Sequence, residues 1–166
     1  MQTDNRVDPP ETAGELETLT GFLDYFRDTV VMKASGLTDA QGAKQLLPSI
    51  TTVSGLVRHL ADVERFWFQG RIDGQPDVRT RWSDEDPDGE FRVSDEDSLA
   101  GIIADYESAC AGSRAVLLNY ALEDRCRGGE GRQTVRWVLV HMIEETGRHC
   151  GHLDILRELL DGSTGD

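Results

Sequence analysis

Histidine and glutamate residues recur at helical spacing in one segment of the chain, residues 134–160. The segment contains three of the four histidines, has no proline, and shows the apolar periodicity of one long amphipathic helix. At about 100° per residue, His141, Glu145, His149 and His152 fall on the same side of this helix as several apolar residues. Ionisable groups on a core-facing stripe need partners, because burying them alone costs several kcal/mol. A divalent metal is one suitable partner for two imidazoles and a carboxylate.

The remaining histidine, His59, lies on the apolar stripe of another predicted helix, residues 54–69. Glu145 and His149 are four residues apart and therefore project side by side from one helical face. If His59 reaches them across a helical bundle, the three side chains form a metal site with two histidines and one carboxylate. Three protein ligands leave one position open for water or substrate, as in catalytic zinc sites. Spacing alone leaves open the alternative that these are hydrogen-bonded polar groups of a core.

The elements that must position these residues are helices, since strand signals are almost absent. Apolar periodicity predicts four of them, at residues 11–32, 54–69, 95–121 and 134–160. Thr52 or Ser54 can cap the second helix, and Gly70 fits a stop just beyond its end. We therefore predict an all-α four-helix bundle with a long crossover loop. Residues 11–162 are expected to form a single domain, preceded by a disordered arm at residues 1–10.

The crossover loop, residues 71–97, is acidic and irregular. Loops of this length are usually functional or mobile. Trp82 and Phe91 are apolar residues that we expect to anchor the loop to the bundle. Ser94 and Asp97 resemble a capping box at the start of the third helix.

Bulk composition excludes some classes of partner. The net charge of −14, from 31 acidic and 17 basic residues, disfavours binding to nucleic acid and to anionic membranes. No apolar run approaches the length of a membrane span. Three cysteines without CxxC spacing and an N-terminus without an apolar signal segment predict a cytoplasmic location. A homodimer is compatible with the sequence.

Two segments resemble a known family. HLADVERFWF (residues 59–68) and HMIEETGRHCGHLDILREL (residues 141–159) are similar to the signature segments of the DinB-like superfamily, and the likeness extends over about residues 11–160. Within it, the sequence most resembles an unassigned actinobacterial branch related to the mycothiol-dependent maleylpyruvate isomerases. The resemblance implies a four-helix bundle with one divalent metal on His59, Glu145 and His149. Zinc is the expected ion, with nickel or iron as alternatives. His152 stands where other members carry a glutamine.

The resemblance also implies thiol chemistry. A low-molecular-weight thiol such as mycothiol would attack an electrophilic substrate, so we expect a thiol S-transferase or isomerase. His141 and His152 are candidates for supporting the ligands or transferring protons. Glu64, Trp67 and Arg148 are candidates for substrate binding, although Glu64 could instead pair with an arginine and Trp67 could belong to the core.

Two other functions stay open at this point. One is a non-catalytic metal- or ligand-binding module in a stress response. The other is an interaction protein whose acidic loop meets a partner.

Overall fold

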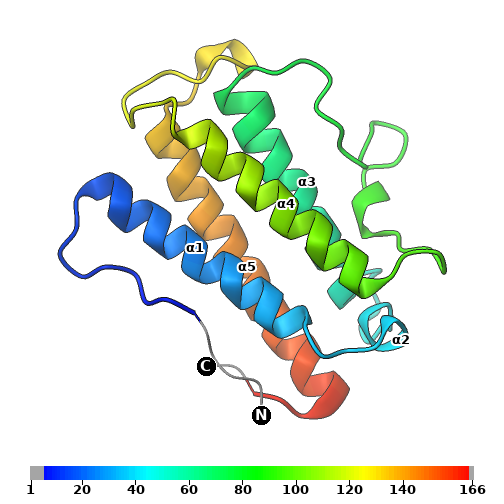
Figure 1. Cartoon of the computed structure of the whole chain (residues 1–166). Coiled ribbons are helices and arrows are strands. Elements are labelled where there is room, and N and C mark those ends of the chain that lie inside the picture. Colours follow the sequence, from blue (N-terminus) through cyan, green and yellow to red (C-terminus); the bar gives the residue numbers. More distant parts are fainter. Residues whose placement is uncertain (1–5, 165–166) are drawn as a thin grey trace.

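A computed structural model describes residues 6–164, and its regular structure is almost entirely helical (Figure 1). The α-helices are α1 (Glu15–Ala34), α2 (Asp39–Gly42), α3 (Val53–Glu64), α4 (Leu99–Leu117) and α5 (Val135–Asp161). A π-helix, Arg65–Ile72, continues α3, and short 3₁₀ helices lie at Gly89–Phe91 and Gly129–Gly131. Within residues 6–164 the only β pairing is the isolated bridge between Arg125 and Thr134. The predicted all-α fold is confirmed.

The four long helices form two parallel pairs that run in opposite directions (Figure 1). α1 lies beside α5, with Glu15 paired to Arg136 near their starts and the Lys33 carbonyl bonded to Arg157 near their ends. α3 lies beside α4, where Arg58 pairs with Asp97. Two parallel neighbours cannot be joined by a tight turn, so a long connection between α3 and α4 must cross the length of the bundle. Residues 73–98 make this crossover.

Several helix boundaries differ from the predicted ones. Ser98, and not Ser94, caps α4 by accepting a hydrogen bond from the Gly101 amide, so the helix starts at Leu99. The Ser94 amide and hydroxyl instead bond to the Asp97 carboxylate in a local turn before the helix. Gly70 does not end the second helix, because the π-helix carries it on to Ile72. Thr52, one of the two predicted candidates, is the cap of α3.

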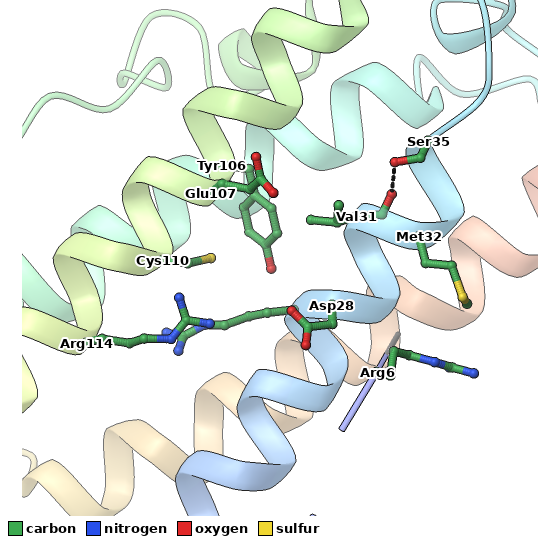
Figure 2. A pocket seen from close by; sticks show the side chains of 10 residues that line it. Arg6, Asp28, Val31, Met32, Ser35, Tyr106, Glu107, Cys110 and Arg114 are labelled. Carbon is green, nitrogen blue, oxygen red and sulfur yellow. Dashed lines mark hydrogen bonds between the residues drawn. The ribbon is translucent and has the colours of Figure 1, made fainter. Parts of the chain in front are cut away.

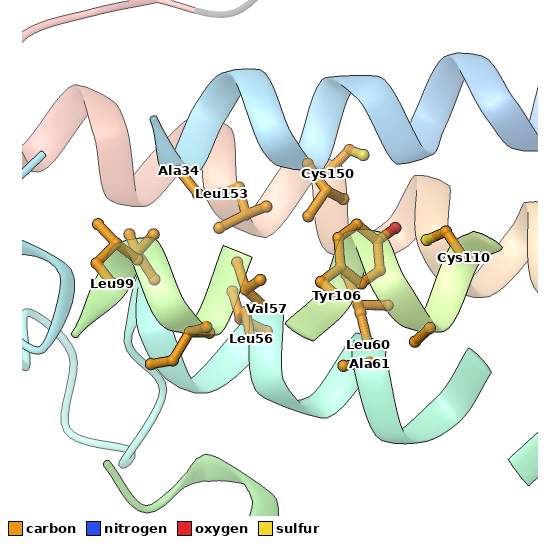
Figure 3. Packing of buried hydrophobic residues seen from close by; sticks show 14 of the residues in the cluster. Ala34, Leu56, Val57, Leu60, Ala61, Leu99, Tyr106, Cys110, Cys150 and Leu153 are labelled. Carbon is orange, nitrogen blue, oxygen red and sulfur yellow. The ribbon is translucent and has the colours of Figure 1, made fainter. Parts of the chain in front are cut away.

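Two apolar clusters fill the bundle. Figure 3 shows one of them, in which side chains from all four long helices meet around Leu56, Leu60, Tyr106 and Leu153. Helical spacing places Leu16 and Phe22 on the apolar stripe of the first helix, but the structure leaves Leu16 42% exposed and Phe22 44% exposed. The buried stripe of α1 instead passes through Leu23, Arg27, Val30 and Ala34, and two charged residues of the helix, Arg27 and Lys33, are buried.

The arm predicted to be disordered, residues 1–10, falls partly outside the described residues. Residues 6–10 have no regular secondary structure and run along α1. The Arg6 guanidinium donates to the Thr29 hydroxyl at 3.3 Å, and a Cβ on Gly21 would come within 2.6 Å of the Pro10 ring. None of the described helices is long and apolar enough to cross a membrane.

Candidate metal centre

His59, Glu145 and His149 meet between α3 and α5. One ligand atom from each residue can be chosen so that all three lie within 4.8 Å of one another. Glu145 Oε1 is central, at 3.2 Å from His59 Nε2 and 3.2 Å from His149 Nε2. The antiparallel contact of α3 with α5 brings the first residue to the other two. The structure thus brings together the three residues that sequence spacing singled out.

The donor set fits a divalent metal. Ligand atoms about 2.1 Å from a tetrahedral zinc ion lie about 3.4 Å apart, close to the Glu145–histidine distances found here. Two imidazoles and one carboxylate also match the donors used by zinc, nickel and iron(II) sites. All three side chains are half-buried, which limits competition by water while leaving a route of access. These residues could therefore hold one metal ion.

Hydrogen bonds within the centre shift the pKa values of Glu145 and His59. Hydrogen bonds from His149 and His59 hold the pKa of Glu145 well below its usual range, against the opposing effect of burial. Burial lowers the pKa of His59, but hydrogen bonds with Glu145 and Glu90 outweigh it and leave that pKa raised. Glu145 is therefore an anion at neutral pH, as a metal ligand must be.

A second acidic residue, Glu90, comes from the crossover loop. Its Oε1 atom lies 3.2 Å from His59 Nδ1, on the side of the ring away from Glu145. Its neighbour Phe91 stacks on the His59 ring with centroids 4.9 Å apart and an interplanar angle of 17°. Phe91 was expected to anchor the loop. Glu90 was missed, because its acidic surroundings in the sequence suggest a solvated turn.

His152 lies next to the centre and is exposed. Its Nδ1 atom is 3.1 Å from His149 Nδ1, so the two imidazoles contact each other directly. Burial, followed by the charges of His149 and Arg148, lowers the pKa of His152. His152 also lines a cavity of about 220 Å³ between α5 and the segment before α3. The cavity walls are largely apolar and comprise Leu47, Ser49, Thr51, His152, Ile155 and Leu156.

His141 lies one turn before Glu145 but has other neighbours. Its ring stacks on Trp137 and meets the edge of Trp67, with centroids 5.3 and 4.7 Å apart. Trp67 also packs against the other apolar cluster of the bundle, which includes Val63, Phe68 and Met142. The carboxylate paired with His141 is Glu144, at 3.8 Å. His141 and Trp67 therefore form an aromatic group beside the metal centre.

The other two candidates for substrate binding point elsewhere. Glu64 is buried and accepts two hydrogen bonds from Arg27 of α1, at 2.8 and 2.6 Å. Arg148 is exposed and pairs with Glu144 on the same helix. Glu64 therefore pairs with an arginine, which was the stated alternative to a role in substrate binding.

A larger cavity of about 500 Å³ lies between α1 and α4 (Figure 2). Asp28 and Met32 reach it from α1, and Tyr106, Cys110 and Arg114 reach it from α4. None of the three candidate ligands lines it. None of them lines the smaller cavity either, but His152, which contacts His149, does, so the smaller cavity is the one connected with the candidate ligands.

Comparisons with known proteins agree with this architecture. A family model described as mycothiol S-transferase matches residues 18–162. The chain is also similar in structure to a protein titled "conserved protein of locus from Enterococcus faecalis", with a TM-score of 0.66 at 16% sequence identity. That similarity covers 92% of this chain and 100% of the other, and at such low identity it supports the fold alone. The comparison with curated proteins found no match.

Proposed function

Because the protein belongs to the mycothiol S-transferase family, we propose that it transfers a low-molecular-weight thiol such as mycothiol to an electrophilic substrate. The family match confirms the DinB-like resemblance of the sequence. The observation that carries the proposal is the convergence of His59, Glu145 and His149 next to His152, which lines a cavity. A divalent metal held by these residues would lower the pKa of a coordinated thiol and supply a thiolate near neutral pH.

The chain's own cysteines do not suit the role of nucleophile. Cys110, Cys126 and Cys150 are all free and buried. Burial raises the pKa of Cys110 and of Cys150 to about 12, so both stay protonated at neutral pH. The reactive thiol must therefore come from a second substrate, as the family description implies.

His152 is placed to take up the proton that the thiol releases. It contacts His149 and lines the cavity, so it borders both the ligands and the space for a substrate. Its lowered pKa leaves it neutral near pH 7, and a neutral imidazole can accept a proton. Because other members carry a glutamine here, this role would be particular to this chain. We expect a His152→Ala variant to keep metal binding and to lose thiol transfer by about 10²-fold or more, the usual contribution of a general base.

The cavity indicates the kind of electrophile that would fit. Leu47, Ile155 and Leu156 give the cavity apolar walls. Ser49 and Thr51 are polar residues that line it from the segment before α3. An apolar substituent of the electrophile would bury surface there at about 25 cal/mol per Å². We therefore propose that the second substrate carries an apolar group.

The experiment that tests this function measures metal content and thiol transfer together. Elemental analysis of purified protein is expected to find about one equivalent of zinc, or of nickel or iron(II), per chain. Transfer of mycothiol to a fluorogenic electrophile such as monochlorobimane should require that metal. His149→Ala is expected to lose both metal and transfer, whereas His141→Ala, a histidine of the same helix outside the triad, should keep the metal.

The outcomes separate the functions left open by the sequence. Transfer that continues unchanged after chelation would contradict the metal-dependent reaction. One equivalent of metal without transfer to any of several electrophiles would instead favour a non-catalytic metal-binding module.

A further inference from the structure

We infer that Glu90 is a positioning residue, which fixes the orientation of His59 so that its Nε2 atom faces the metal position. The inference rests on the proposed metal site and assigns to the crossover loop a part in building it. Its evidence is the geometry of the His59 ring, the burial of Glu90 and the way in which the loop is held.

The two nitrogens of His59 face two different carboxylates. Nδ1 lies 3.2 Å from Glu90 Oε1, and Nε2 lies 3.2 Å from Glu145 Oε1. Only one ring nitrogen can ligate a metal at this centre, and Nε2 is the one beside Glu145 and His149. A proton on Nδ1, donated to Glu90, leaves Nε2 with the lone pair that a ligand needs. Metal-binding histidines commonly have such a carboxylate on their other nitrogen.

Glu90 is almost fully buried, which is unusual for a carboxylate. The residue is 5% exposed, although the loop around it is acidic and mostly exposed. Its Oε2 atom is buried without a hydrogen-bond partner, so His59 provides the hydrogen bond found for this carboxylate. A buried carboxylate is costly unless it is paired. The hydrogen bond with His59 is therefore the interaction that compensates the burial of Glu90 in this part of the loop.

Close backbone packing holds Glu90 in place. A Cβ on Gly55, one turn before His59, would come within 2.9 Å of the Phe91 carbonyl oxygen. A Cβ on Gly89 would come within 2.2 Å of the Arg81 carbonyl oxygen. The Arg81 amide in turn donates to the buried Asp62 carboxylate of α3 at 2.6 Å. Glycine at position 55 thus lets the 3₁₀ helix lie directly on α3, and glycine at position 89 lets that helix lie against the Arg81 backbone.

The decisive experiment measures metal affinity rather than turnover. Zinc affinity, determined by competition with a chelator, is expected to fall about 10–100-fold in Glu90→Ala, the usual effect of losing such a partner. Glu90→Gln keeps an acceptor oxygen without the charge and should lose less. Glu85→Ala, which removes an exposed carboxylate from the same loop, serves as the control and should stay within about twofold.

A spectroscopic measurement distinguishes positioning from general stability. In zinc-loaded protein labelled with ¹⁵N-histidine, we expect a His59 Nδ1–H signal in slow exchange with water, and we expect it to disappear in Glu90→Ala. Unchanged affinity in Glu90→Ala, or His59 bound through Nδ1, would overturn the inference. If Glu90→Ala does not fold, the isosteric Glu90→Gln decides, because affinity equal to that of the unaltered protein would likewise overturn it.

A second variant tests the same inference without altering either partner. Gly55→Ala should weaken zinc binding by displacing the Phe91 backbone, although alanine ordinarily stabilises a helix relative to glycine. Affinity equal to that of the unaltered protein would mean that loop docking does not position Glu90. Failure of the unaltered protein to bind zinc would instead refute the proposed function, so the two failures are distinguishable.

Discussion

Replacing Glu64 with alanine should destabilise the bundle by about 3–5 kcal/mol, because it leaves the Arg27 guanidinium buried without its main partner. Arg27 is 2% exposed and Glu64 is 1% exposed, and two hydrogen bonds of 2.8 and 2.6 Å join them. Asp24 also accepts a hydrogen bond from Arg27 at 2.8 Å and would remain. The expected loss is therefore nearer the lower end of this range.

Urea unfolding of the metal-free protein, followed by circular dichroism, measures the effect. With a slope of about 2 kcal/mol per molar urea, a loss of about 3 kcal/mol moves the midpoint by about 1.5 M. Glu130→Ala is the control, since it breaks an ion pair with Arg132 that is exposed on both sides and should cost less than about 1 kcal/mol.

A double replacement separates loss of a partner from loss of the pair. Arg27→Met with Glu64→Leu removes both charges and should be less destabilising than Glu64→Ala alone, since an apolar pair of similar size needs no compensation. Stability of Glu64→Ala within 1 kcal/mol of the unaltered protein would refute the reasoning. It would mean that water or Asp24 compensates Arg27 fully, and Glu64 would again be available for a role in binding.

Three further predictions concern thiols, pH and capping. Burial raises the pKa of Cys110 and of Cys150 to about 12, so Ellman's reagent at about pH 8 should modify both only after unfolding; rapid modification of the native protein would contradict their burial. In the metal-free protein, the raised pKa of His59 gives stability that is fully present below its usual pKa of about 6.5 and is lost as pH rises through the raised value. The melting temperature should therefore fall as the pH rises above about 6.5, and a His59→Gln variant should lack that fall. Thr52→Ala removes the hydroxyl that accepts from the Gly55 amide at 3.0 Å and should cost about 1 kcal/mol in urea unfolding, whereas no measurable loss would show that water replaces the cap.

The parts of the structure that follow helical periodicity were predictable from the sequence. The spacing of Glu145 and His149 fixes their common face, and His59 stands on an apolar stripe, so a bundle brings the three together. Thr52 and Ser54 were the two predicted candidates for the cap because their hydroxyls stand at the start of a strongly periodic run, and the structure selects Thr52. These features depend on residues a few positions apart.

Features set by tertiary packing were not predictable. Glu90 lies in an acidic segment that suggests solvation, and its burial depends on contacts with His59 and α3. The sequence offered one signal for the burial of Glu90, namely its two neighbours: Gly89 before it and the apolar Phe91 after it, in an otherwise polar loop. The π-helix at Arg65–Ile72 likewise could not be predicted from the local sequence, because Gly70 indicated that the helix ends there. Leu16 and Phe22 fit an apolar stripe, but the buried face of α1 is turned toward Arg27.

The connectivity of the bundle also constrains how the protein is made. His59 Nε2 and Glu145 Oε1 are in contact although the two residues are 86 positions apart. A nascent chain that has left the ribosome only as far as α4 carries one of the three candidate ligands and lacks the parallel neighbour of α1. Premature capture of an ion by the growing polypeptide is thereby disfavoured. Loading is expected to follow the emergence of α5 and its docking beside α1.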